Sequence, residues 1–366
     1  MHFPFLLPAH RAWGRLAVGV LLGAAACAAP KTAPTPTAAA AATPAAPALP
    51  PADPRAATVA FYSLDNLYDP QDDPATSDQD FTPTGRLAWD DIRYRTKLRN
   101  LASVVAEIGG PGGPDVLGAV EMENRRVLDE LVAQPALAGR GYQIAHFDSP
   151  DPRGSDCALL YKAGRFEPTS QKAIRLTLPD TTMGTRDLLL VEGRLLGEPI
   201  TFLVAHWPSR RGGRKAVRRR YDVARQCRRV MDERVRANPQ ARVLLMGVFN
   251  DAPTDSSVTT YLGAGGQLVN APKGELYNAF YDYQVAGKGT MYYRSRPDVF
   301  DHMVLTPGLL GQTGLRFKPG SATIFSPERL TSPQTKFPGE PLGSFLGRKY
   351  IGGYSDHFPV YLTLVK

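Results

Sequence analysis

The amino-acid sequence predicts a layered α/β sandwich, and three observations carry the prediction. The chain has 366 residues, of which 43% are hydrophobic and 21% charged; this excludes a disordered or collagen-like protein and supplies a large buried core. Short apolar runs typical of buried strands alternate with segments whose apolar residues repeat at helical spacing. Polar residues gather where the strands are expected to end, as they do in layered α/β enzymes.

Strands and helices are expected in alternation along the chain. Apolar residues from Leu98 to Ile108 repeat at helical spacing and are followed by Gly109-Gly110-Pro111, which stops a helix. A second helix is predicted at about Arg214–Arg234, and the strands of Asp187–Glu192 and Ile200–Ala205 are expected to pair as neighbours. The other predicted strands are Thr58–Ser63, Val116–Val120, Ala158–Tyr161, Val243–Val248, Val299–Leu305 and Phe358–Leu364.

The first 27 residues have the features of an export signal. Met1–Arg15 contains basic residues and no acid, and the apolar stretch Leu16–Ala26 is too short for a membrane span, which needs roughly 20 residues. Small residues before Cys27 resemble a bacterial lipobox, although Ala24 stands where Leu is usual. We expect a lipoprotein anchored at Cys27 on the outer membrane, the cell surface or the periplasmic side; a plain secretory signal is the alternative.

Residues 28–57 read as a tether, because 22 of these 30 residues are Ala or Pro. Frequent prolines prevent a continuous helix and there is little to bury, so a semi-extended linker is expected. The sequence shows neither an internal repeat nor a second linker after it. Residues 58–366 are therefore predicted to form one domain, which we expect to be monomeric.

Charge and cysteine content limit the partners and the covalent framework. Lys and Arg exceed Asp and Glu by 43 to 35, a net charge of +8, which suits a polyanionic or phosphate-bearing partner. Three cysteines are too few for a disulfide framework. A disulfide between Cys157 and Cys227 is possible in an exported protein, but their apolar and helical settings favour buried thiols.

Polar residues gather near the ends of the predicted strands in a fixed order along the chain. They are Asp65-Asn66, Glu121, His206, Asn250-Asp251, Asp301-His302 and Ser355-Asp356-His357. Each alone is weak, because an Asp after a strand is usually a turn residue or helix cap. Together, carboxylate and amide oxygens suit a hard cation such as Mg²⁺, Mn²⁺ or Ca²⁺. Two histidines near such a cation can divide the proton transfers of phosphoester hydrolysis.

The same segments resemble the motifs of the endonuclease/exonuclease/phosphatase family, of the deoxyribonuclease I and exonuclease III type. Phe61–Asp69 reads FYSLDNLYD and is similar to the family's first-strand signature FYNVENLFD. The resemblance spans Val59 to Val365 and implies two packed, mainly antiparallel sheets flanked by helices. The other segments that carry it are Asp115–Asn124, Arg153–Tyr161, Val204–Gly213, Phe300–Met303 and Tyr354–Val360.

The resemblance implies a metal site and a set of catalytic residues. Asp65 and Glu121 would bind the divalent metal, with help from Asp356. Around the phosphate, His357 would be the general base or a transition-state contact.

The same resemblance assigns partners to the catalytic histidines. Asp301 would orient His357. His206 would assist from the other side of the phosphate, with Asp156 behind it. Asn250 would contact a phosphate oxygen.

Two positions depart from the family pattern. The family motif Gly-Asp-Phe-Asn is here Gly-Val-Phe-Asn, with Val248 in place of an Asp that is thought to orient or activate the attacking water. Asp251 is not expected to replace it, because a residue three positions along points elsewhere. Ser63 replaces an Asn that touches the metal or its neighbours. Three interpretations follow: a slowed enzyme with His357 as base, which we favour, a binding protein on an enzyme scaffold, or a sequence altered at one codon.

The substrate is expected to be a nucleic-acid phosphodiester. Ten Lys or Arg residues lie between Arg210 and Arg229 with only Asp222 opposing them, a pattern that suits phosphates or a solvated amphipathic helix. Arg210 and Arg211 are the expected phosphate contacts, because a guanidinium fork fits phosphate oxygens. A lipid phosphodiesterase is the alternative, which the aromatic segment Tyr277–Tyr293 leaves open; its rings are equally compatible with base stacking or the core.

Overall fold

The computed structural model describes residues 53–179, 184–269, 272, 274–293, 296–333 and 338–366. The predicted signal segment, Cys27 and most of the tether lie outside the described residues. The described part belongs to one compact unit, Ala48–Lys366. None of its helices has the length and apolarity that a membrane span requires. The first strand begins at Ala56 rather than at residue 58, so the last two residues assigned to the tether are part of the fold.

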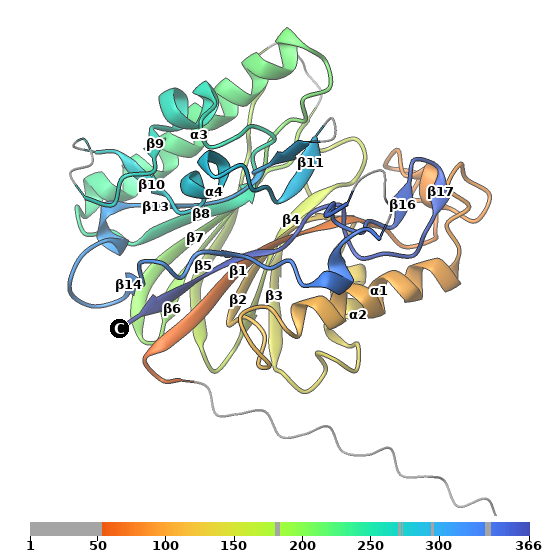
Figure 1. Ribbon diagram of the computed structural model, residues 1–366, viewed down its shortest axis with the longest axis horizontal. Coiled ribbons are helices and arrows are strands. Elements are labelled where there is room, and N and C mark those ends of the chain that lie inside the picture. Colours follow the sequence, from red (N-terminus) through yellow and green to blue (C-terminus); the bar gives the residue numbers. More distant parts are fainter. Residues whose placement is uncertain (1–52, 180–183, 270–271, 273, 294–295, 334–337) are drawn as a thin grey trace, which may run out of the picture. The chain divides into compact units, whose positions relative to one another are not determined.

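Two sheets of seven strands each form the centre of this unit (Figure 1). The first sheet has the order β14-β18-β1-β2-β4-β3, with β15 also paired to β18. Its strands are β1 (Ala56–Leu67), β2 (Val116–Met122), β3 (Tyr142–His146), β4 (Asp156–Lys162), β14 (Arg316–Phe317), β15 (Thr323–Ile324) and β18 (Val360–Val365). All of its pairs are antiparallel except β1 with β2.

The second sheet has the order β5-β6-β7-β8-β13-β10-β9. Its strands are β5 (Phe166–Ile174), β6 (Leu188–Leu195), β7 (Glu198–His206), β8 (Val243–Val248), β9 (Ala264–Gly265), β10 (Leu276–Asn278) and β13 (Asp301–Leu305). The predicted pairing of the two strands before the basic helix is confirmed, because β6 and β7 form an antiparallel hairpin. Short hairpins are formed by β11 (Met291–Tyr293) with β12 (Arg296–Asp298) and by β16 (Phe345–Leu346) with β17 (Lys349–Tyr350).

Helices cover the outer face of each sheet. Helices α1 (Asp91–Val105) and α2 (Arg125–Val132) share an apolar cluster with the first sheet, whereas α3 (Arg214–Ala237) shares one with the second (Figure 1). A third cluster, between the sheets, joins side chains such as Phe61 and Met246. The remaining short elements are α4 (Tyr281–Val285), three 3₁₀ turns (Gln79–Phe81, Pro307–Leu309 and Glu328–Leu330) and one π-helical turn (Ser257–Leu262).

Local sequence explains where these helices start and why some were not predicted. Asp90 caps α1 by accepting a hydrogen bond from the Arg93 backbone N–H, and Asn124 caps α2 in the same way. Helix α1 ends at Val105, before the expected glycine stop, and turns lead on to Gly110. Helix α2 and strands β3 and β5 were not predicted. Most of β5 is solvent-exposed and leaves no apolar alternation, whereas α2 has an apolar face but only eight residues, too few to establish a helical repeat.

The register of the second sheet brings three site positions together. His206 in β7 is paired with Val248 in β8, which is paired in turn with Asp301 in β13. Gly247 makes the approach of β7 and β8 possible, since a Cβ there would lie 2.0 Å from the Ala205 carbonyl oxygen. Side chains paired across adjacent strands project from the same face of a sheet. The chain order alone does not reveal that these three residues are neighbours.

Candidate active site

His357 and Asp301 join the two sheets. Asp301 begins β13 in the second sheet, and His357 lies just before β18 in the first. The Asp301 Oδ2 atom is 2.7 Å from His357 Nδ1, and both side chains are buried. The expected contact between these residues is therefore present, and it leaves Nε2 as the ring nitrogen available to another group. The backbone N–H of His357 donates to Ser355 Oγ, which donates to the Ser63 carbonyl oxygen within β1.

Glu121 links the second histidine to the first sheet. Its Oε2 atom accepts a hydrogen bond from Ser63 Oγ at 3.1 Å, and its Oε1 atom lies 3.6 Å from His206 Nε2. Ser63, the position at which the family usually has Asn, thus contacts the carboxylate expected to bind metal. His206 ends β7 in the opposite sheet and is 5% exposed. The site therefore lies where strand ends of both sheets meet.

Backbone strain marks the same positions. Glu121 has φ of 65° and Asn250 has φ of 56°, and Asp65 and Asn66 after the core of β1 have φ of 49° and 56°. Such left-handed conformations are uncommon outside glycine and cost of order 1 to 3 kcal/mol each. They cluster at functional sites, because the surrounding structure must hold them in place. Three of the site segments predicted from the sequence coincide with them.

The two histidines have opposite electrostatic settings. Burial lowers the pKa of His206 well below its usual value, and the nearby positive charges of Arg186, Arg153 and His357 lower it further. Burial also acts to lower the pKa of His357, but the neighbouring carboxylates, Asp301 first and then Asp356 and Glu121, together outweigh burial and raise the pKa to about 10. At neutral pH His206 is thus neutral, whereas His357 carries a positive charge. A protonated His357 suits the transition-state contact, one of the two roles expected, and its role as a base stays a prediction.

Among the expected metal ligands, Glu121 is the best placed. Carboxylate and hydroxyl oxygens from Glu121 and Ser63 suit Mg²⁺, which commonly uses one or two carboxylates together with substrate phosphate. Asp356 lines an open hollow together with Gly343 and Tyr292. The pKa of Asp356 is raised to about 7, mainly because its carboxyl group has little contact with solvent and secondly because the Asp65 carboxylate repels its negative charge. Carboxylates crowded in this way favour a bound cation, so the residues fit a divalent metal.

Asp65 has a different partner from the one expected. The buried Lys97 ammonium donates to Asp65 Oδ2 at 2.9 Å and to the Asp65 carbonyl oxygen at 2.7 Å. The Ser344 backbone N–H donates to the same Oδ2 atom at 3.0 Å. These contacts neutralise the carboxylate and tie β1 to α1. Metal binding by Asp65 remains a prediction, and its pairing with Lys97 argues for a structural role.

Val248 leaves a gap in the polar network. It is 2% exposed and lies between His206 and Asp301 in the sheet. On either side, His206 Nδ1 and Asp301 Oδ1 are buried and have no hydrogen-bond partner among the described residues. Buried polar atoms are normally satisfied. An isopropyl group between two unsatisfied atoms is the structural consequence of the departure from the family motif.

Asp251 does not fill this gap, as expected. Its Oδ2 atom accepts hydrogen bonds from Arg220 Nε and Ser257 Oγ, both at 2.7 Å. Asn250 is also engaged, because its Nδ2 group donates to the Trp207 carbonyl oxygen at 2.9 Å. That contact fixes the strand end and leaves the amide oxygen as the group that can face a substrate.

The pairing of Asp156 corrects a prediction. Asp156 was expected to lie behind His206, but its Oδ2 atom is 2.9 Å from His146 Nε2 and its Oδ1 atom accepts from the Ser149 backbone. One group of three His, Cys, Asp or Glu side chains in the described residues has its potential metal-binding atoms within 4.8 Å of one another. It consists of His146, Asp148 and Asp156. The two hydrogen bonds of Asp156 explain that grouping as a structural contact at the β3–β4 edge.

Arg210 also differs from expectation. Its guanidinium contacts Asp255 at 3.0 Å and Asp298 at 3.2 Å, and it lies 4.5 Å from the Phe300 ring centre. It therefore fastens the loops around the strand ends instead of facing solvent. Arg211, the second expected phosphate contact, is exposed.

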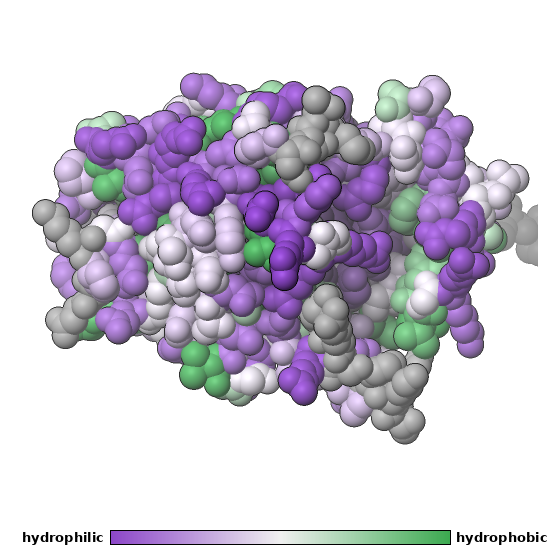
Figure 2. Space-filling model, turned by 90° about the horizontal axis from the view of Figure 1, so that it is seen from above, coloured by the Kyte–Doolittle hydropathy of each residue, from purple (hydrophilic) through white to green (hydrophobic). Residues whose placement is uncertain are grey.

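The basic helix combines packing with surface charge. Arg220 is buried against Asp251, and Arg228 donates to the carbonyl oxygens of Leu262 and Gly274. The exposed cations of the segment are Arg211, Arg214, Lys215, Arg218, Arg225 and Arg229. The face seen from above in Figure 1 is largely hydrophilic, with apolar residues in small separate groups (Figure 2). The segment is therefore an amphipathic helix with a charged outer face, as one of the two interpretations expected, and phosphate binding by that face stays a prediction.

The aromatic segment is mainly structural. Tyr277 and Phe280 belong to the core between the sheets, and Tyr283 packs against it and donates to the Ala322 carbonyl oxygen. Tyr292 lines the hollow beside Asp356. The segment therefore gives little support to an apolar mouth for a lipid substrate.

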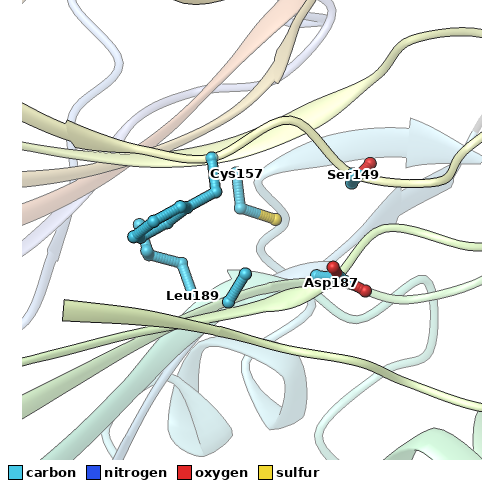
Figure 3. Close-up of a pocket in the computed structure, with 6 residues that line it drawn as sticks. Ser149, Cys157, Asp187 and Leu189 are labelled. Atoms are coloured by element: carbon cyan, nitrogen blue, oxygen red, sulfur yellow. The ribbon is translucent and has the colours of Figure 1, made fainter.

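The two described cysteines are free and buried, which confirms the expected thiols. Burial raises the pKa of the Cys227 thiol to about 12 and also raises that of Cys157. Cys157 faces Leu189 across a gap between the sheets, with Ser149 and Asp187 at one end (Figure 3). The free volume there is about 10 Å³, enough for one water molecule at most, so the gap is not a substrate pocket.

Sequence reasoning missed three residues near this site. Lys97, which precedes the predicted helical repeat, was not singled out, and neither were Arg153 and Arg186. Arg153 had been included in a matched segment without a role. Their partners lie in distant parts of the chain, so the sequence pattern held no signal beyond the presence of basic residues near the motifs.

Solved structures share this fold at low sequence identity. Zebrafish (D. rerio) TDP2 in complex with a single-strand DNA product is 16% identical, with a TM-score of 0.52, over 85% of this chain and 99% of that one. A mannosyl-6-phosphatase from Bacteroides thetaiotaomicron is 18% identical, with a TM-score of 0.53, over 85% and 100%. An endonuclease/exonuclease/phosphatase family protein from the same bacterium is 19% identical, with a TM-score of 0.53, over 85% and 98%.

The search of curated proteins found no match. The sequence profile of the Endonuclease/Exonuclease/phosphatase family matches residues 58–366, which is nearly the whole described unit. Together with the two-sheet fold and the strand-end site, this match establishes the family. The chain belongs to the endonuclease/exonuclease/phosphatase family.

Proposed function

We propose that this protein is a divalent-metal-dependent phosphoester hydrolase. The observation that carries the proposal is the meeting of two histidine–carboxylate pairs from opposite sheets, His357 with Asp301 and His206 with Glu121. The family name covers nucleases and phosphatases, which all cleave phosphoester bonds. The divalent ion, most simply Mg²⁺, would be held by Glu121 with Ser63 and Asp356 near it, and would stabilise negative charge on the phosphoryl oxygens.

The two histidines supply the proton transfers. Hydrolysis joins a water oxygen to phosphorus and breaks the bond to the ester oxygen. Neutral His206 is suited to take the proton from water, and the His357 imidazolium is suited to donate a proton to the leaving oxygen or a hydrogen bond to the phosphoryl group. Asp301 orients His357 and balances its charge. Because Val248 stands where the family motif has an aspartate, this centre lacks one carboxylate, and we expect slow turnover.

We infer that the substrate is a nucleic-acid phosphodiester. The exposed cations around the start of α3 and the net charge of +8 support this choice. The complex of TDP2 with a single-strand DNA product shows that this fold accommodates such a ligand in a relative. A phosphomonoester is the second candidate, favoured by the likeness to a mannosyl-6-phosphatase.

The test is a metal-dependence assay of the unaltered full chain. Plasmid DNA, single-stranded DNA, bis(p-nitrophenyl) phosphate and p-nitrophenyl phosphate would each be supplied with Mg²⁺, Mn²⁺ or Ca²⁺, and with EDTA as the control. The proposal is supported if the protein cleaves DNA and bis(p-nitrophenyl) phosphate and if EDTA stops both reactions. Cleavage of p-nitrophenyl phosphate alone would support the phosphatase. Phosphate-ligand binding without turnover of any substrate would instead indicate a binding protein on this scaffold.

We also propose that the protein is exported and anchored through a lipid on Cys27, and that it is monomeric. The basic and apolar segments before Cys27 and the Ala/Pro-rich stretch after it support the anchor. Labelled palmitate should be incorporated into the full chain and not into its Cys27→Ala variant. Equal labelling of both, or release of the unaltered protein into the medium, would contradict lipidation.

A further inference from the structure

A fixed loop between β3 and β4 presents Arg153 at the site. The side chain of Arg153 is 52% exposed, but the backbone around it is held firmly. The Arg153 carbonyl oxygen accepts a hydrogen bond from Tyr68 Oη at 2.8 Å, and the Pro152 carbonyl oxygen accepts from the Ser77 backbone N–H at 2.7 Å. The loop continues directly into β4, where Asp156 is paired with Met122, the residue after Glu121. The loop is thus a rigid support next to the expected metal ligand.

Asp151 holds two arginines at once. Its Oδ1 atom accepts from the backbone N–H of Arg153 at 2.9 Å and from Arg153 Nε at 3.2 Å, and its Oδ2 atom accepts from Arg186 Nη1 at 2.8 Å. Arg186 is buried and donates through Nη2 to the Trp207 carbonyl oxygen, directly after His206. The network therefore runs from the loop to the end of β7.

The charge of this group is not balanced. One carboxylate, Asp151, faces two guanidinium groups, and the buried Arg186 alone would neutralise it. The Arg186 Nε–H is also buried and has no partner among the described residues. Arg153 is therefore surplus to the stability of Asp151 and adds a net positive charge beside the site. Arg186 contacts the residue after His206 and shares Asp151 with Arg153, and in agreement with this placement the positive charges of both arginines lower the pKa of His206 after the larger effect of burial.

Building on the proposed phosphoester hydrolysis, we propose that Arg153 is a phosphate-binding residue and that Asp151 and Arg186 position it. Its Nε and backbone N–H are the groups that donate to Asp151. The outer edge of the guanidinium can thus offer paired N–H groups to two phosphate oxygens, the geometry that favours arginine over lysine. The phosphoryl group would then lie between Arg153 on one side and the His357 imidazolium on the other.

The experiment compares Arg153→Gln and Arg153→Lys with the unaltered full chain. Arg194→Gln serves as the matched control, because Arg194 is an exposed arginine at the β6–β7 turn, the opposite end of β7 from His206. The readouts are the inhibition constant of inorganic phosphate in bis(p-nitrophenyl) phosphate hydrolysis, and direct phosphate binding in Mg²⁺ followed by phosphorus NMR. Thermal unfolding checks that each variant is folded.

Arg153→Gln should weaken phosphate binding by about tenfold or more, the effect of losing one charged hydrogen-bonding group. The phosphate affinity of Arg153→Lys should lie between those of the unaltered chain and Arg153→Gln, because lysine keeps the positive charge but lacks the paired N–H groups of the guanidinium. Arg194→Gln should leave phosphate binding unchanged. A change in Arg153→Gln of less than twofold, or one equal to that of Arg194→Gln, would overturn the inference.

Direct binding separates this inference from the proposed function. If no form of the protein hydrolyses any ester but phosphate binding is lost in Arg153→Gln, the hydrolase proposal fails and the binding role stands. If the unaltered chain hydrolyses the diester and Arg153→Gln retains its phosphate affinity, only the inference fails. If the unaltered chain does not bind phosphate at all, the inference is overturned.

Discussion

Val248 lies opposite Asp301 in the antiparallel ladder of β8 and β13, so an isopropyl group borders the carboxylate that holds His357. The pairing of Val248 with His206 on its other side makes it the centre of the site. An aspartate there would reach the unsatisfied His206 Nδ1 atom and restore an acceptor for a water proton. We expect Val248→Asp to raise kcat for the diester by about 100-fold or more, the scale on which catalytic carboxylates act.

Val248→Asn is the matched control for that prediction, because an asparagine side chain has nearly the same shape as an aspartate but carries no charge. It should give a gain much smaller than Val248→Asp. The aspartate should also lower the free energy of unfolding, since burying a carboxylate costs several kcal/mol unless it is paired. If the two variants turn over equally, a carboxylate is not what this position lacks.

Asp301→Asn should remove the support of the His357 charge. The asparagine keeps the shape but not the negative charge, so kcat/KM should fall by about 100-fold or more. Because the pKa of His357 is about 10, a reaction that needs its protonated form should decline in the unaltered protein only as pH rises through that value. In Asp301→Asn the decline should occur at lower pH, closer to the ordinary histidine value of about 6.5. A pH–rate profile of both proteins tests this, and an unchanged alkaline limb would refute the assigned role.

Glu121 and Asp65 should respond differently to loss of charge. Glu121→Gln removes the best-placed metal ligand, so the Mg²⁺ concentration for half-maximal activity should rise by about tenfold or more. Asp65→Asn removes the partner of the buried Lys97 ammonium, so it should lower the free energy of unfolding by about 3 kcal/mol. Mg²⁺ titrations and urea unfolding separate the two effects. An Asp65→Asn protein with unchanged stability and a raised Mg²⁺ requirement would restore Asp65 as a ligand.

His302 should make the fold sensitive to acid. Burial lowers the pKa of His302 to about 4, and its Nδ1 atom accepts from Asn278 Nδ2, so the folded protein resists protonation there. The unfolded chain takes up a proton near pH 6.5, which means that stability is lost as pH falls from about 6.5 towards 4. At pH 5 the loss should be about 2 kcal/mol. Urea unfolding at pH 7 and pH 5 measures it.

The control for that effect is His302→Gln, which cannot titrate. Its free energy of unfolding should be lower at both pH values, because the imidazole also contacts the Asp251 carbonyl oxygen. Between pH 7 and pH 5, however, the free energy of unfolding of this variant should change less than that of the unaltered chain, because one fewer proton is taken up on unfolding. An identical pH slope in the two proteins would show that His302 is not the acid-sensitive group.

The sequence alone determined the local elements and the order of the site segments. The strand Val243–Val248 was predicted with its observed bounds, and β6 and β7 pair as expected, because a buried strand leaves its apolar run in the residues themselves. The same pattern places His206 directly after one predicted strand and His357 directly before another, whereas Asp301 was expected inside the strand Val299–Leu305 and in the structure begins β13. The absence of a carboxylate at position 248 was also evident from the sequence, because the family motif Gly-Asp-Phe-Asn is here Gly-Val-Phe-Asn.

The tertiary structure alone decided which side chains meet. Asp156 contacts His146 instead of His206, Asp65 contacts Lys97, and Arg153 joins the site through Asp151. Each of these pairs depends on how strands, loops and helices from separate parts of the chain are placed against one another. Periodicity reports the face on which a residue lies, but hydrogen bonds of about 3 Å depend on non-local register and loop geometry. Those are fixed only when the two sheets pack.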